Sequence, residues 1–190
     1  MSDDLTTIIG VPSAPIHLGR YSSVRDTQKR IGFELPDDYV DVACRYGSGG
    51  FEIGEMLSIR FFNPFDPDYT RVVSDECAAL RRGLNSLFSD TVDVELIAHA
   101  VFPDPEGLLP ILSDDSGNWY CYLQTGPPNQ WPLGRIGEVQ LFEQELCSFL
   151  VGLLREEIQI EPSILDSATF EGNPNCSFGS YPLEVLLHKK

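Results

Sequence analysis

Apolar residues recur at helical spacing in four stretches of the chain. Residues 23–31 follow a serine that can cap a helix, and Gly32 marks the end of that helix. Residues 36–46 open with a proline and two aspartates, which favour the first turn of a helix. Residues 68–87 and the strongly apolar residues 142–157 keep the same period. The pattern predicts four helices.

Short runs of β-branched and aromatic residues between these helices are typical of strands. They occupy residues 51–62 (which include Gly54), 95–102, 107–112, 118–124 and 135–142. The later runs follow one another through hairpin-like connections. We therefore expect an α+β fold: a mixed, largely antiparallel sheet with N-terminal, middle and C-terminal helices packed around it, segregated toward one side.

Carboxylates and small polar residues separate two of these apolar runs, in LLPILSDDSGNWYCYL at residues 108–123. A calcium loop of the EF-hand type needs ligands at its first and twelfth positions and a glycine at the sixth. Placing Gly117 sixth makes Leu112 first and Leu123 twelfth, and neither leucine can ligate a cation. The segment instead predicts a tight turn over residues 114–118, with positive φ at Gly117.

The two ends of the chain are rich in proline and glycine. We expect an irregular lead-in over residues 1–20, one domain over residues 21–157, and an extended tail over residues 158–190 that packs on the domain. The first residues are acidic, unlike a secretion signal. The longest apolar run is far shorter than the ~20 residues of a membrane span. We expect a soluble, cytoplasmic protein with no membrane contact.

Charge is the strongest compositional feature, with a formal net charge of −16. Residues 83–154 contain a single cation, Arg135, whereas residues 20–30 contain four cations and one acid. The acids of the first span are Asp90, Asp93, Glu95, Asp104, Glu106, Asp114, Asp115, Glu138, Glu143 and Glu145. Such a field repels nucleic acid and attracts a basic protein. The alternative is a solvated surface that only keeps the protein soluble.

The residues that usually carry catalysis or bind cofactors are sparse. His17, His99 and His188 have no cysteine or second histidine at metal-ligand spacing, and the five cysteines include no C-x-x-C pair. The thiols are expected to be reduced and mostly buried. No phosphate-binding loop or nucleophile elbow occurs. We expect no enzyme, no catalytic residue, no metal and no cofactor.

Two segments together resemble the SUKH superfamily. They are ELPDDYVDVACRYGSGGF with the strand that follows it, and GLLPILSDDSGNWYCYL with the later QWPL and an apolar helix. The likeness extends from Tyr21 to Glu157. It implies an α+β binding module without catalysis, as in bacterial immunity proteins that neutralise toxins and in fungal cell-wall regulators. The matching framework residues are Leu35, Pro36, Tyr39, Gly47, Gly50, Gly117, Trp119 and Trp131.

The resemblance and the charge together favour an immunity protein that binds a basic, nuclease-type toxin through an acidic surface. The candidate partner-binding residues are Asp90, Asp93, Glu95, Asp104, Glu106, Asp114, Asp115, Trp119, Trp131, Glu143 and Glu145. The alternative is an intracellular scaffold or regulator of the same fold with no toxin partner. A hydrolase that uses His99 or Asp104 is the third hypothesis. The chain is expected to be a monomer or a weak dimer.

Overall fold

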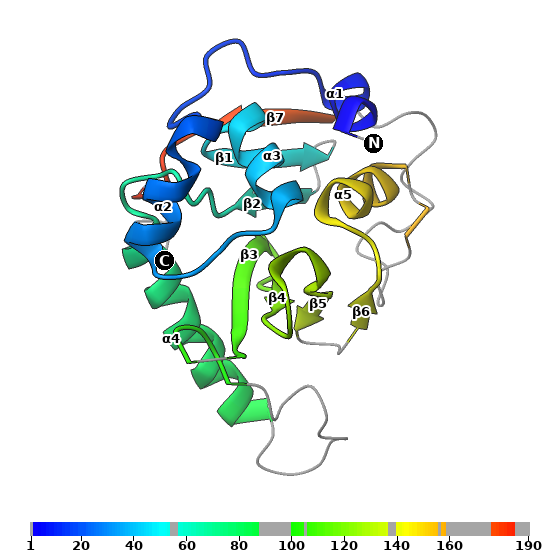
Figure 1. Ribbon diagram of the computed structural model, residues 1–190. Coiled ribbons are helices and arrows are strands. Elements are labelled where there is room, and N and C mark those ends of the chain that lie inside the picture. Colours follow the sequence, from blue (N-terminus) through cyan, green and yellow to red (C-terminus); the bar gives the residue numbers. More distant parts are fainter. Residues whose placement is uncertain are drawn as a thin grey trace.

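A computed structural model describes residues 2–53, 57–87, 100–104, 106–136, 140–155, 157–158 and 176–184. Its helices are α1 (Ser2–Ile9), α2 (Val24–Ile31), α3 (Asp37–Tyr46), α4 (Tyr69–Leu87) and α5 (Leu146–Leu154), with the short 3-10 helices η1 (Tyr21–Ser23) and η2 (Pro128–Gln130). Its strands are β1 (Gly49–Ile53), β2 (Leu57–Phe61), β3 (Leu108–Asp114), β4 (Trp119–Leu123), β5 (Leu133–Ile136), β6 (Gln140–Phe142) and β7 (Cys176–Ser180). Figure 1 shows their arrangement.

The described strands form one sheet in the order β6-β5-β4-β3-β2-β1-β7. Every pair of neighbouring strands is antiparallel, and the parallel component is an isolated bridge between Val101 and Leu108. The predicted α+β fold is confirmed. Because most neighbouring strands are also consecutive in the chain, short hairpins supply most of the connections.

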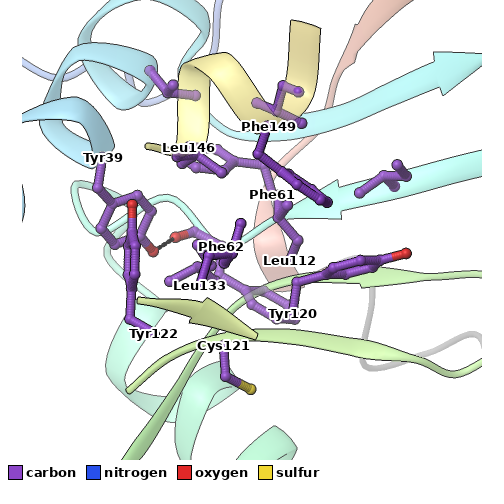
Figure 2. Close-up of a cluster of buried hydrophobic side chains, with 14 of the residues drawn as sticks. Tyr39, Phe61, Phe62, Leu112, Tyr120, Cys121, Tyr122, Leu133, Leu146 and Phe149 are labelled. Atoms are coloured by element: carbon purple, nitrogen blue, oxygen red, sulfur yellow. Dashed lines mark hydrogen bonds between the residues drawn. The ribbon is translucent and has the colours of Figure 1, made fainter. Parts of the chain in front are cut away.

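Helices lie on both faces of the sheet, so the expectation that they gather on one side is wrong. Side chains alternate across β4. The ring of Tyr120 packs on Phe149 of α5, with ring centroids 5.6 Å apart. The indole of the neighbouring Trp119 instead donates a hydrogen bond to Glu76 of α4. Figure 2 shows Cys121 pointing away from Tyr120 and its neighbours in the same way.

The core between the sheet and helices α3 and α5 is rich in aromatic rings (Figure 2). Tyr39 is fully buried and packs edge-on against Phe61 and Tyr122, with ring centroids 5.5 and 6.0 Å apart. Its hydroxyl donates to the Phe62 carbonyl, which keeps this polar atom satisfied inside the core. The apolar stripe predicted for residues 36–46 therefore faces inward.

The turn predicted between β3 and β4 is confirmed. Gly117 has a φ of +86°. The carboxylate of Asp114, which is 2% exposed, accepts hydrogen bonds from the backbone N–H groups of Ser116 and Asn118 and from the Asn118 side chain. The described residues contain no group of His, Cys, Asp and Glu that could hold a metal ion.

Two local expectations need correction, and a third falls mostly on residues that the structure does not describe. Residues 2–9 form helix α1 and not an irregular lead-in, because Leu5 is buried and the helix packs on α5. The expected strand over residues 51–62 is two antiparallel strands, β1 and β2. Most of the strand predicted over residues 95–102 lies outside the described residues, and Val101 forms only the isolated bridge.

The C-terminal segment also adds to the sheet. Strand β7 pairs with β1 at the edge of the sheet, where Phe178 lies opposite Phe51. The predicted tail over residues 158–190 is otherwise mostly outside the described residues. No helix in the described part of the chain combines the length and the apolar character needed to cross a membrane.

Candidate protein-binding site

A groove of about 470 Å³ opens where the first turns of α3 and α5 meet the η2 loop. We call it the acidic groove. It is lined by Pro36, Asp37, Asp38, Asp41, Tyr122, Pro128, Asn129, Gln130, Trp131, Pro132, Glu143, Gln144 and Glu145. Three segments far apart in the chain therefore contribute to it.

The carboxylates of the groove come from the first turns of α3 and from the residues just before α5. They are Asp37, Asp38, Asp41, Glu143 and Glu145, and no Lys, Arg or His is among the described residues that line the groove. A concave surface with charges of one sign focuses the electrostatic field and concentrates ligands of the opposite sign. The groove is thus suited to a cationic partner.

Asp38 holds the floor of the groove together. Its carboxylate accepts hydrogen bonds from the backbone N–H of Leu146 at 2.5 Å and from the Tyr122 hydroxyl at 3.0 Å. It also accepts one from the backbone N–H of Tyr39. Burial raises the pKa of Asp38 above its ordinary value, although these hydrogen bonds oppose the rise. This carboxylate is a structural link between α3 and α5.

The walls of the groove are fixed by exposed polar pairs. Asp37 and Asn129 exchange two hydrogen bonds of 2.8 Å, which tie the start of α3 to η2. One turn further along α3, the Tyr21 hydroxyl donates to Asp41 at 2.7 Å. This hydrogen bond, together with burial, raises the pKa of Tyr21 to about 12. Tyr21 remains 65% exposed, so it offers an aromatic surface beside the groove.

Trp131 supplies the apolar wall. Its ring lies 6.4 Å from that of Phe33 and 6.3 Å from that of Tyr122, measured between ring centroids. Its indole N–H donates to the Gly126 carbonyl at 3.0 Å. The ring is half-buried and held in place, so a partner could cover it without having to order it first.

A second hollow, of about 420 Å³, continues the groove between α1 and α5. The two share Gln144, and the second adds the carboxylates of Asp4 and Glu157. Val151 and Ile158 give it a partly apolar lining. The anionic surface thus extends from the η2 loop to the N-terminal helix.

Comparison with known protein families gives a match over most of the chain. The family described as SMI1 / KNR4 (SUKH-1) matches residues 22–150. The chain belongs to this family. Searches of curated proteins and of solved structures gave no match. Every residue that lines the acidic groove lies within the matched range, whereas α1 and β7 of this SMI1/KNR4 protein lie outside it. Membership supports a protein-binding role, as an immunity protein or a related SMI1/KNR4-like protein.

The structure brings only some of the predicted binding residues of this SMI1/KNR4 protein together. Trp131, Glu143 and Glu145 line the acidic groove. Trp119 lies on the opposite face of the sheet, against α4. Asp90, Asp93 and Glu95 lie outside the described residues.

The remaining predicted acids lie away from the groove lining. Asp104 pairs with Arg81 at 2.8 Å and Asp115 pairs with Arg60 at 3.3 Å, so a neighbouring cation offsets each charge. Glu106 is exposed next to Asp104. Asp114 is buried in the β3–β4 turn and cannot contact a partner without disrupting that turn.

Sequence reasoning missed half of the groove. Asp37, Asp38 and Asp41 belong to it, yet the first two were interpreted only as charges that favour a helix N-terminus. A usable signal was present, because Asp37 and Asp41 are four residues apart and so lie on one face of a helix. Their proximity to Glu143 and Glu145 depends on a long-range contact that the sequence does not reveal.

Proposed function

We propose that this SMI1/KNR4 protein is a non-catalytic immunity protein. It binds and neutralises a basic toxin domain, of the nuclease type, through the acidic groove. The observation that carries the proposal is the gathering of five carboxylates in one groove beside a half-buried tryptophan, with no cation in the described lining. We place its action in the cytoplasm of the cell that produces the toxin.

Electrostatics gives this binding its speed and its selectivity. A nuclease holds phosphates with clustered Lys and Arg side chains, so a groove that presents carboxylates imitates the charge of its substrate. The formal net charge of −16 adds long-range attraction and accelerates the encounter. Because Asp37 is held by Asn129, the anionic surface is partly preorganised before the partner arrives.

Aromatic groups supply the short-range contacts. Tyr and Trp are the residues that most often dominate binding energy when a partner removes them from water. Trp131 lies in the groove and Tyr21 lies beside it, bonded to Asp41. A cationic side chain laid over either ring would gain a cation–π contact in addition to its ion pairs.

Rescue from toxicity tests the proposal. A toxin domain encoded beside the gene for this chain is expressed in a susceptible host, alone or together with the chain. We expect the native chain to restore growth, and the groove variant Asp37→Asn/Glu143→Gln/Glu145→Gln to lose most of that protection. The matched control removes three exposed acids outside the groove, in Asp104→Asn/Glu106→Gln/Asp115→Asn, and should protect like the native chain.

Two outcomes would contradict the proposal. Full protection by the groove variant would place the interface elsewhere. A chain that never protects, yet captures an intracellular partner with no toxic activity, would favour the scaffold or regulator.

A further inference from the structure

Arg20 and Arg30, two of the four cations of residues 20–30, line a third hollow, whose charge is opposite to that of the acidic groove. It has a volume of about 510 Å³, and we call it the basic hollow. It is lined by His17, Leu18, Arg20, Ser23, Thr27, Arg30, Phe65 and Pro67. Two guanidinium groups and an imidazole therefore face one small space, and no carboxylate is in its described lining. It shares no lining residue with the acidic groove.

These cations lack the ion pairs that other arginines have. In the described part of the chain, Arg60, Arg71 and Arg81 each pair with an aspartate. Within the described residues, none of the four cations of residues 20–30 forms an ion pair with an acid, although the full sequence has 29 acids and only 13 Lys and Arg residues. Uncompensated guanidinium groups beside one hollow are available to an added anion.

The hollow is held open by contacts among three segments. Arg30 donates to the Pro64 carbonyl at 2.5 Å, and the Asn63 side chain donates to the His17 carbonyl at 2.8 Å. Gly19 lies directly against Phe65, because a Cβ at this glycine would come within 2.5 Å of the ring. The position of the hollow is thus set by the fold and does not depend on a ligand.

His17 is oriented by the buried Asp66. Its Nδ1 lies 2.8 Å from the Asp66 carboxylate, so Nε2 is the ring nitrogen left for a ligand in the hollow. Beside these polar groups, Leu18 is 44% exposed and Phe65 and Pro67 line the wall. The hollow therefore offers cationic groups next to an apolar surface.

We propose that the basic hollow binds a small oxyanion, a phosphate or carboxylate group carried on an apolar body. Arg20 and Arg30 pair with the oxygens, and Nε2 of His17 donates a further hydrogen bond when the ring is protonated. The apolar body lies against Leu18 and Phe65. The net charge of −16 disfavours a polyanion such as nucleic acid.

Titration of the isotope-labelled full chain with phenyl phosphate, benzoate and neutral benzyl alcohol tests this site by amide chemical shifts. We expect at least one of the two anions to shift residues 17–30 and 63–67, whereas benzyl alcohol shifts them little. The stronger anion identifies the oxyanion class. Arg20→Gln should weaken binding about fivefold, which corresponds to the loss of one exposed ion pair.

Arg25→Gln is the matched control, because Arg25 is an exposed arginine of α2, the helix that carries Arg30, but does not line the hollow. It should change the affinity less than about twofold. Equal weakening by the two variants would mean a diffuse ion atmosphere and would overturn the proposal. The proposal would also be overturned if the amide chemical-shift changes caused by both anions were no larger than those caused by benzyl alcohol. A circular dichroism spectrum for each variant confirms that it is folded.

Discussion

The backbone N–H of Leu146 donates a hydrogen bond of 2.5 Å to the carboxylate of Asp38, 108 residues earlier in the chain. This contact joins the first turn of α3 to the first turn of α5. Asp37 and Glu145, the acids that precede the two bonded residues in the chain, therefore line the same groove. The anionic surface is therefore a product of tertiary structure and not of a charged run in the sequence.

Removing the Asp38 carboxylate, and with it the contact between α3 and α5, should destabilise the fold. Asp38→Ala leaves the Leu146 N–H and the Tyr122 hydroxyl without their acceptor, at a cost of about 2 kcal/mol in the free energy of unfolding. Asp37→Ala, which removes an exposed acid from the same helix turn, should cost clearly less. Urea denaturation of the two variants measures the difference. Equal losses would show that the Asp38 contacts are not structurally important.

Asp66 should give the protein a specific sensitivity to acid. Burial alone would raise the pKa of Asp66, but hydrogen bonds from Ser48, Asp68, Leu183 and His17 together lower it below its ordinary value. A lowered folded-state pKa contributes stability that is present above the unfolded value of about 3.9 and is lost as the pH falls through the folded value.

The test compares Asp66→Asn with the native chain across this range. The variant should be less stable at neutral pH, and the gap between the two unfolding free energies should narrow as the pH drops below about 4. Asp115→Asn, which changes a half-exposed acid, should cost less stability at neutral pH than Asp66→Asn. A constant gap for Asp66→Asn would contradict the assignment.

The cysteines should be inert while the protein is folded. Burial raises the pKa of both Cys77 and Cys147 to about 12 and that of the half-buried Cys44 to about 11. The thiolate is the reactive form, so little of it exists at a pH of about 8. Reaction with a chromogenic disulfide should be slow for the native chain and fast for all five thiols in guanidinium chloride. Fast labelling of Cys77 in the native chain would contradict this burial.

The two tryptophans should respond differently to a bound partner. Trp131 lies in the acidic groove, whereas Trp119 is on the opposite face of the sheet, bonded to Glu76. The change in tryptophan emission on binding should persist in Trp119→Phe and largely disappear in Trp131→Phe. The reverse result would move the interface to the α4 face.

Local elements of the fold could be predicted because their signals are local. The helix predicted over residues 68–87 is α4 (Tyr69–Leu87), and the turn at residues 114–118 is as expected. Helix α1 was missed although Leu5, Ile8 and Ile9 are spaced for one helix face. Nearby prolines and glycines suggested irregular structure. In the fold, the packing of this segment on α5 stabilises the helix.

Non-local features could not be predicted. Strand β7 exists through its pairing with β1, more than 120 residues earlier in the chain, and no short pattern in its sequence indicates that partner. Asp104 and Asp115 were predicted to bind a partner because they belong to the acidic span over residues 83–154. In the structure, each of them pairs with an arginine. Charge counts along a chain give no information about which charges are compensated in three dimensions.

The association rate with the toxin domain, measured as a function of salt, tests the central claim most directly. The groove variant Asp37→Asn/Glu143→Gln/Glu145→Gln should associate about tenfold more slowly at low ionic strength, with a flatter salt dependence than the native chain. The control variant Asp104→Asn/Glu106→Gln/Asp115→Asn removes the same number of charges, and its association rate should fall much less. If the two variants behave alike, net charge and not the acidic groove drives binding, and the account is wrong.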